Sequence, residues 1–522
     1  MAPFMNEYES AYVSDVGVNS LKQKAGASHV EIAATAKPPV ADDYMYDFKY
    51  NHALPTSDVL GVEIPVHCDA QREAESILAR LSEVLGKGDA QGFTDLFLDY
   101  GVWRDKLSFT WDYRTFNFKP AILKAATDLF SHTKATNLKF LTPAPTIHRP
   151  YPDYAYLQFI ASFETDVVVG SAAVTSVLTK DGWKIYHMHT VAEKLKQFPE
   201  LPVHDGYMTG LISWEKQRGI DVDTADPEVL IIGGGQNGLA LAARCKALGL
   251  DNLIIERSEE IGEVWTKRYE YLSLHFPHWA DDLPYFPYPK RWPSYTPAQK
   301  QGCYMQRYAS ALELNIWTKS SVVKAEQDDQ GNWTVVINKG GKESRTLHPK
   351  QVVLATSLLG VPKLPDTPGM DIFKGVIRHS SAHDSSRDFV GKKLCQDCAV
   401  SFRFGLALRP PVSTPPSTAR AAASTSPSSN GRQPTSSTKS RTGFSDTINS
   451  VGAILGDKIA DKVNPIWGID EEGEIKSAYR ETGVPNLWLM VGYLPYTRYH
   501  SALLAMRLKA LKEGIATAPY TK

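Results

Sequence analysis

The sequence feature that most constrains the fold is a glycine-rich turn between two apolar runs. Val229-Leu230-Ile231-Ile232 predicts a short buried strand, and Gly233-Gly234-Gly235-Gln236-Asn237-Gly238 follows it directly. Leu239 to Leu248 is rich in alanine and leucine and predicts a helix, after which Leu253–Ile255 predicts a second buried strand. This order of strand, turn, helix and strand indicates an α/β unit with a parallel sheet.

The spacing of the glycines gives each one a physical role. Gly233 permits the tight turn, Gly235 lets a phosphate approach the backbone at the helix N-terminus, and Gly238 lets helix and strand pack closely. Glu256, 18 residues after Gly238, is placed to accept hydrogen bonds from a ribose diol and would repel a 2′-phosphate, which favours FAD or NAD over NADP. The alternative is a glycine turn in a non-binding α/β domain. The expected contacts of the dinucleotide are Gly233, Gly235, Gln236, Asn237, Gly238, Glu256 and Arg257.

Composition limits the remaining possibilities. The chain has 522 residues, which indicates two or three domains, and its net charge of −1 provides no basic face for a nucleic acid. Its five cysteines do not suggest a disulfide framework. The N-terminal segment lacks the pattern of a signal peptide, and no apolar run reaches 18 residues. We therefore expect a cytoplasmic protein with no membrane partner and no metal site.

The first part of the chain carries a different pattern. Residues 1–60 show no sustained periodicity and are expected to be a flexible tail. Within 61–200, apolar residues from Ala74 to Leu85 predict an amphipathic helix, and a second short helix is expected over Ala90–Leu98. Strands are then predicted at Tyr154–Thr165, Ser171–Thr179 and Trp183–Thr190, which together indicate an α+β domain. A polar linker is expected over 201–225.

This order of helices and strands resembles the NTF2-like (SnoaL-like) cone fold. Six polar and aromatic residues have two interpretations, a ligand pocket inside the cone or structural Arg–Asp pairs beside core aromatics: Trp103, Arg104, Asp105, Trp111, Asp112 and Arg114. The sequence favours the structural interpretation and leaves the pocket open.

Two motifs after the glycine turn narrow the choice of dinucleotide. Gly262-Glu263-Val264-Trp265-Thr266-Lys267-Arg268-Tyr269 and Leu272-Ser273-Leu274-His275 resemble the segment that folds over FAD in the flavin-containing monooxygenases. The resemblance implies FAD as cofactor, with Trp265, Arg268 and His275 near it. Alternatively, Trp265 and Tyr269 are simply buried four residues apart on one helix face.

Further motifs extend the resemblance over 226–390, the expected Rossmann-like FAD-binding domain. Val352–Thr356 with the prolines after it resembles the family's return strand, so Thr356 is expected to contact FAD. Residues 373–383 resemble the F-x-G-x-x-x-H-S/T signature that joins the FAD and NADPH domains in the family, including its Baeyer–Villiger members. That signature implies positioning roles for Phe373, Gly375, His379 and Ser380.

The family pattern then breaks. Residues 391–441 contain no second G-x-G-x-x-G, and 413–441 lack Val, Ile, Leu, Met and aromatic residues, so this low-complexity segment takes the place of an NADPH domain. A frameshift or mis-spliced exon would explain the break. Resemblance resumes over 442–522, the C-terminal part of the FAD-binding domain, where Gly492 is an expected FAD contact and Ser501–Lys512 a predicted helix.

The resemblance implies an FAD-dependent monooxygenase that uses NADPH and O₂ to oxygenate a small organic substrate, by N or S oxygenation or in the Baeyer–Villiger manner. The alternative is a catalytically impaired FAD-binding protein without a functional NADPH site. No catalytic acid or base can be named from the sequence, and the substrate and a homo-oligomeric state both stay open.

Overall fold

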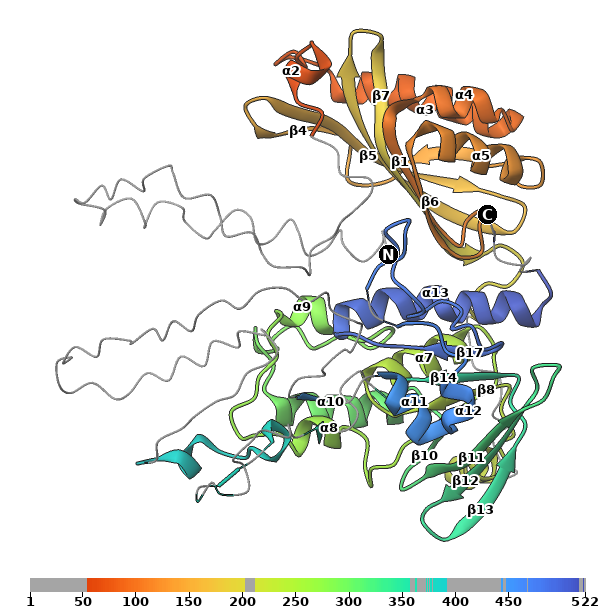
Figure 1. Cartoon of the computed structure of the whole chain (residues 1–522), viewed down its shortest axis with the longest axis vertical. Helices are drawn as coiled ribbons and strands as arrows, with labels where there is room; N and C mark the ends of the chain where they lie inside the picture. The colour runs from red at the N-terminus through yellow and green to blue at the C-terminus, as the bar shows by residue number, and fades with distance from the viewer. Residues whose placement is uncertain are drawn as a thin grey trace, which may run out of the picture.

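The computed structural model describes residues 54–201, 212–356, 447–466, 468–515 and 520, with short pieces between 362 and 391 and at 443–444. Within these ranges the chain forms two packed modules, one above the other in Figure 1, with the long helix α13 at their boundary. No helix in these ranges is both long and apolar enough to cross a membrane.

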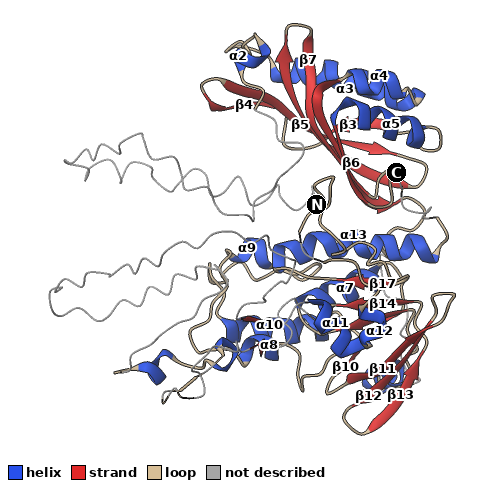
Figure 2. Ribbon diagram, in the orientation of Figure 1, coloured by secondary structure: helices blue, strands red, loops and turns tan. Residues whose placement is uncertain are grey.

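The N-terminal module is a curved seven-stranded sheet with its three longer helices on one face (Figure 2) and its shortest helix packed with the opposite face. The strand order is β2-β1-β7-β6-β5-β3, with β4 beside β5, and only the β1–β7 pairing is parallel among these strands. The helices are α2 (Ser57–Leu60), α3 (Ala70–Lys87), α4 (Ala90–Asp95) and α5 (Phe118–Phe130). The strands are β1 (Phe97–Lys106), β2 (Tyr113–Asn117), β3 (Thr136–Phe140), β4 (Thr146–Tyr151), β5 (Tyr154–Glu164), β6 (Val168–Thr179) and β7 (Gly182–Leu195).

Local signals in the sequence explain where helix α3 begins and ends. The carboxylate of Asp69 accepts hydrogen bonds from the amides of Gln71 and Arg72 and so caps α3 at its N-terminus. Gly88, at a φ of 70°, ends the helix. The apolar stripe of α3 (Ala74, Ile77, Leu81 and Leu85) is buried against the sheet.

The second module is built on a five-stranded parallel sheet of order β10-β9-β8-β14-β17. Alternate strand residues face opposite sides: Ile231 and Val353 pack with the long helices, whereas Leu230 and Val352 pack with the three-stranded β11-β12-β13 sheet. The arrangement is Rossmann-like. Its strands are β8 (Val229–Ile232), β9 (Asn252–Ile255), β10 (Ile316–Trp317), β11 (Ser321–Gln327), β12 (Trp333–Lys339), β13 (Glu343–Leu347), β14 (Gln351–Leu354) and β17 (Leu487–Leu489), with β15 (Pro362–Lys363) and β16 (Gly443–Phe444) paired apart from it.

The helices of this module are α6 (Trp214–Asp223), α7 (Gln236–Ala247), α8 (Glu263–Thr266), α9 (His278–Asp281), α10 (Ala298–Ala311), α11 (Thr447–Leu455), α12 (Asp457–Ala460) and α13 (Leu494–Lys512). Two short 3₁₀ helices lie at Ser380–Ala382 and Ser386–Phe389.

Several sequence-based expectations differ from these elements. Helix α6 lies inside 201–225, which was expected to be a linker, and α4 ends at Asp95 because the chain turns there into β1. Helix α13 begins at Leu494 rather than Ser501, since Pro495 is tolerated in the first turn of a helix. The expectations for residues 1–53 and 392–441 lie outside the described residues.

Candidate dinucleotide-binding site

The glycine turn has the geometry that its spacing predicts. Gly233 has a φ of 113°, and a methyl group on it would lie 2.7 Å from the carbonyl oxygen of Ala355. A methyl group on Gly238 would lie 2.0 Å from the carbonyl oxygen of Gly233, so only glycine lets α7 pack this close to the turn. A methyl group on Gly235, in contrast, would meet no atom within 4 Å. The turn is therefore tightly packed at Gly233 and Gly238 and open at Gly235.

Gly235 is also the N-cap of α7, and no side chain caps that end of the helix. The first amides of a helix lack intrahelical partners and carry the positive end of the helix dipole. An uncapped N-terminus beside open space is the arrangement that a pyrophosphate requires.

Glu256 follows the end of β9 and faces the glycine turn. Its Oε2 accepts a hydrogen bond from the amide of Gly234 at 2.7 Å, and its Oε1 accepts one from the amide of Ser258 at 2.7 Å. Because an ionised carboxylate offers about four acceptor positions, it can hold the turn and still accept from a ribose diol.

Gln236 and Asn237 both contact the C-terminal segment. The side-chain amide of Gln236 donates to the carbonyl oxygen of Gly492 at 3.1 Å. Asn237 is buried, and its Oδ1 accepts a hydrogen bond from the hydroxyl of Thr497 on α13. The C-terminal segment thus lies directly against the first turn of α7.

The residues of the G-x-x-W-x-x-R-Y motif are only partly buried. Trp265 on α8 is half-buried, and its indole nitrogen is buried without a hydrogen-bond partner among the described residues. Since α8 has only four residues, Tyr269 is not on its face, and the interpretation of two buried residues on one helix face is wrong. Three charged or polar candidates are exposed, namely Arg268 and His275 of the two motifs and Arg257 after Glu256.

A small hollow lies where β14 and β17 end, at the carboxyl edge of the sheet. It is lined by Leu354, Thr356, Ser450, Val451, Leu489, Met490 and Val491. Ligands of open α/β sheets bind at this edge, so the positions of Thr356 and the neighbouring Gly492 agree with a cofactor role.

The described part of the F-x-G-x-x-x-H-S/T segment packs beside the G-x-x-W-x-x-R-Y motif. The amide of Glu270 donates to the carbonyl oxygen of Asp384 at 2.9 Å, and the ring of His383 lies 5.5 Å from that of Tyr269. His379 Nδ1 lies 2.8 Å from the hydroxyl oxygen of Ser381, and Ser380 begins a 3₁₀ helix. Phe373 and Gly375 lie outside the described residues.

The six residues considered for a cone pocket do not line one. Trp103 is fully buried among aromatic side chains, and Trp111 belongs to a core shared with the second module. Asp105 is buried and accepts hydrogen bonds from Thr110 and Thr190. The hollow found inside the N-terminal sheet is lined almost entirely by apolar side chains, including Leu81, Phe159 and Met188.

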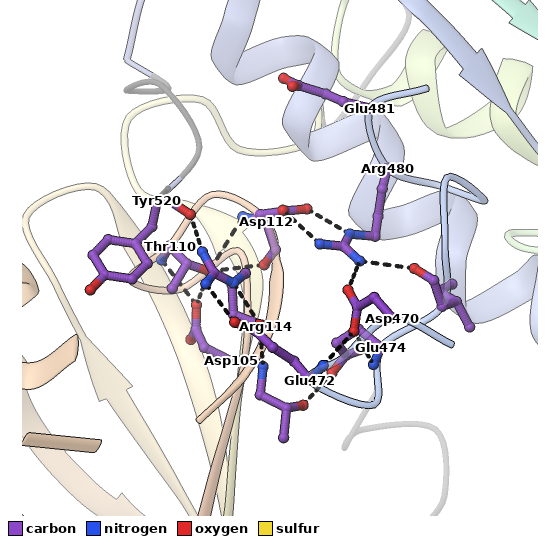
Figure 3. A network of polar contacts seen from close by, with 12 residues as sticks. Asp105, Thr110, Asp112, Arg114, Asp470, Glu472, Glu474, Arg480, Glu481 and Tyr520 are labelled. Atoms are coloured by element: carbon purple, nitrogen blue, oxygen red, sulfur yellow. Dashed lines mark hydrogen bonds and ion pairs between the residues drawn. The ribbon is translucent and has the colours of Figure 1, made fainter. Parts of the chain in front are cut away.

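The other three members of that set form ion pairs with the C-terminal segment, which the sequence did not suggest; Figure 3 shows those of Asp112 and Arg114. Arg104 pairs with Glu474, Arg114 with Glu472, and Asp112 with Arg480. These ion pairs agree with the structural interpretation of the three residues, but their partners lie more than 350 positions away and two of them are glutamates.

The charges at this boundary shift several pKa values. Burial tends to raise the pKa of Asp112, but the hydrogen bonds and charge of Arg480 and the charge of Arg507 outweigh it and keep the pKa low. Burial and the nearby Arg104 lower the pKa of Lys106 to about 7. Burial and the same cations lower the pKa of His500 to about 2, so its ring is neutral.

The comparisons with known proteins agree with this geometry. Residues 226–396 match the model of the Flavin-binding monooxygenase-like family. Indole-3-pyruvate monooxygenase YUCCA1 of Oryza sativa subsp. japonica is 34% identical over 174 residues, which are 33% of this chain and 42% of that protein. Probable indole-3-pyruvate monooxygenase YUCCA4 of Arabidopsis thaliana is 35% identical over 170 residues, 32% of this chain and 40% of that protein.

A solved flavin-containing monooxygenase from Stenotrophomonas maltophilia aligns with 31% of this chain and 48% of its own, at 23% identity and a TM-score of 0.29. The chain spans about two fifths of the length of the curated relatives it matches. Residues 226–396 are therefore similar to the flavin-containing monooxygenase family.

Proposed function

We propose that the chain binds FAD at the glycine turn and acts as an FAD-dependent monooxygenase, using NADPH and O₂ to oxygenate a small organic substrate. The reaction would be N or S oxygenation or of the Baeyer–Villiger type. The observation that carries the proposal is the pairing of an open phosphate cradle at Gly235 with Glu256 at the end of β9, inside the segment that matches the family.

The residues of the turn fit the adenosine half of FAD. Gly235 and the first amides of α7 would hold the pyrophosphate, and Glu256 would accept from the ribose diol. Gly233 and Gly238 would shape the turn, while Gln236 and Asn237 would fix its distance from the C-terminal segment.

The remaining candidates would surround the other half of the cofactor. The unpartnered indole N–H of Trp265 supports a role for this residue as a donor to FAD, since a buried donor without a partner costs about 1–3 kcal/mol. Arg268 and Arg257 would supply positive charge, and His275, Thr356 and Gly492 would line the cleft at the sheet edge. Phe373, Gly375, His379 and Ser380 keep their proposed positioning role. When bound, FAD would supply the redox chemistry, and the protein would orient it and exclude water.

The source of reducing equivalents separates this proposal from its alternative. The family uses NADPH, but the segment that would hold it, 391–441, lacks the second glycine fingerprint in its sequence. A catalytically impaired FAD-binding protein is therefore the second candidate. The glycine turn itself is a poor site for NADPH, because the carboxylate of Glu256 would repel the 2′-phosphate of that cofactor.

We also propose residues 61–200 as an NTF2-like domain. The support is the order of helices followed by a curved, mostly antiparallel sheet.

An anaerobic titration tests the proposed function. The purified chain is loaded with FAD and NADPH is added while flavin absorbance is followed. Loss of the oxidised flavin spectrum, with NADPH consumption once O₂ is admitted, supports the monooxygenase. A flavin that stays bound and oxidised would instead support the impaired protein.

A further inference from the structure

The acidic turn before β17, residues 470–474, is bound by side chains of the N-terminal module. The guanidinium of Arg104 binds both carboxylate oxygens of Glu474, with N–O distances of 2.5 and 2.7 Å, and the Glu474 side chain is fully buried. Thr115 adds a third hydrogen bond to Glu474 at 2.7 Å. Strands β1 and β2 therefore hold a segment more than 350 residues further along the chain.

Asp112 extends this grip to the residues on either side of β17 (Figure 3). Its two carboxylate oxygens accept from Arg480 Nε at 3.0 Å and Nη2 at 2.9 Å. Arg507, on α13, lies 3.5 Å from the same carboxylate and is 2% exposed. Asp112 thus pairs with two arginines, one before β17 and one after it, and each arginine has a second carboxylate partner, Asp470 for Arg480 and Glu481 for Arg507.

Tyr113 begins a second chain of contacts that ends at the candidate flavin site. Its hydroxyl lies 3.1 Å from Nδ1 of His500, whose ring stacks on Tyr479 at a centroid distance of 4.5 Å. The hydroxyl of Tyr479 donates to the carbonyl oxygen of Val491. The next residue, Gly492, accepts the side-chain hydrogen bond of Gln236 in the first turn of α7.

The modules also share one hydrophobic core. Leu107 and Trp111 of the N-terminal module belong to the same buried cluster as Leu239 of α7 and Leu504 of α13. Closely packed protein interiors have low compressibility and transmit small displacements. Removing contacts of the N-terminal module would therefore displace the first turn of α7.

We propose that the N-terminal module is an intramolecular clamp that sets the affinity of the chain for FAD, with Asp112 and Tyr113 as its positioning residues. The inference rests on the proposed FAD site at the glycine turn. It gives the N-terminal module a function without requiring a ligand pocket inside its sheet.

Two substitutions on the full-length chain test the clamp. Asp112→Asn keeps the shape of the side chain but removes the charge that Arg480 and Arg507 share. Tyr113→Phe removes only the hydroxyl that contacts His500 and is the milder change. Asp99→Asn is the control, since Asp99 lies on β1 of the same module and makes only an exposed ion pair with Lys119.

The dissociation constant of FAD, measured by flavin fluorescence, is the main measurement, and the FAD-induced shift in melting temperature is the second. We expect the Kd to rise about tenfold or more for Asp112→Asn and about 3- to 5-fold for Tyr113→Phe. The FAD-induced shift should shrink in both variants, and Asp99→Asn should behave as the wild type.

Each outcome has a distinct meaning. If the two variants melt earlier but keep the wild-type Kd and FAD-induced shift, the contacts only stabilise the fold and the clamp is wrong. If Asp112→Asn does not fold, Tyr113→Phe decides alone. If the wild-type chain itself does not bind FAD, the proposed function fails before the clamp is reached.

Discussion

Arg114 and Glu472 form a two-pronged ion pair across the boundary between the two modules. Nε and Nη2 of Arg114 each lie 2.7 Å from a different carboxylate oxygen of Glu472, and neither side chain is more than a tenth exposed. Removing one member of such a pair leaves the other charged and buried, whereas replacing both with apolar groups does not. The boundary is therefore expected to depend on both members of this pair.

A double-mutant cycle on Arg114 and Glu472 should show that the free energy of unfolding depends on the two residues together. We expect Arg114→Met alone to lower the free energy of unfolding by about 3–5 kcal/mol, because Glu472 is left without its cation. The double variant Arg114→Met, Glu472→Met should lose clearly less than the sum of the single variants. Chemical denaturation of the four proteins measures the difference.

The exposed pair of Lys124 and Asp128 is the control for this cycle, since both side chains are about half exposed or more. Lys124→Met should leave the free energy of unfolding close to that of the wild type. Additive losses at Arg114 and Glu472 would contradict a coupled buried pair.

Substitutions at two glycines of the turn should affect different properties, FAD binding at Gly235 and stability at Gly238. Gly235 has an extended backbone with a φ of −77° and open space beside it, so Gly235→Ala should fold with wild-type stability. Its new methyl group would occupy the space proposed for the pyrophosphate, and we expect FAD binding to weaken at least about tenfold.

Gly238→Ala should have the opposite pattern, because its methyl group would collide with the Gly233 carbonyl oxygen at 2.0 Å. The melting temperature of the apoprotein should fall sharply. Equal stability of the two variants would be inconsistent with the packing described here.

Glu256 should matter through both of its carboxylate oxygens. In Glu256→Gln, one oxygen is replaced by an amide that cannot accept from the backbone amide of Gly234 or Ser258. We expect the FAD Kd to rise about tenfold, as measured by fluorescence titration, with little change for the exposed control Glu259→Gln.

Lys106 should make stability depend on pH. Its side chain is buried with no ion-pair partner among the described residues, near Arg104 and the unpartnered Nε2 of His189, and its pKa is lowered to about 7. Between pH 7 and about 10 the unfolded chain binds more protons at this site than the folded chain does, so this site makes stability rise with pH.

Lys106→Met removes that dependence. The variant should be more stable than the wild type at pH 7, and its advantage should shrink toward pH 9, by up to about 1.4 kcal/mol per pH unit. Denaturation at the two pH values measures it. An advantage that does not change with pH would argue against a neutral Lys106 in the folded state.

The parts of the fold that the sequence predicted are those fixed by local chemistry. The apolar run of β8, the glycines and the end of β9 follow within thirty residues, and each residue type has a local reason to be there. Helix α3 was recognisable for the same reason, since Asp69 and Gly88 mark its ends.

Local sequence patterns could not predict the contacts at the boundary between the two modules. Arg104 and Glu474 are 370 positions apart, and neither stands in a pattern that names its partner. An alternation of Asp470, Glu472 and Glu474 in a turn is ordinarily a solvated acidic loop. Here the first contacts Arg480 while the other two are buried against arginines of β1 and β2, an outcome set by tertiary packing.

FAD retention by the full-length chain tests the central claim most directly. The purified protein is incubated with FAD, separated from free flavin by gel filtration, and its flavin absorbance is compared with its protein concentration. The glycine turn and Glu256 predict that roughly one FAD stays with each chain. Flavin that elutes entirely with the small molecules would contradict the proposed site.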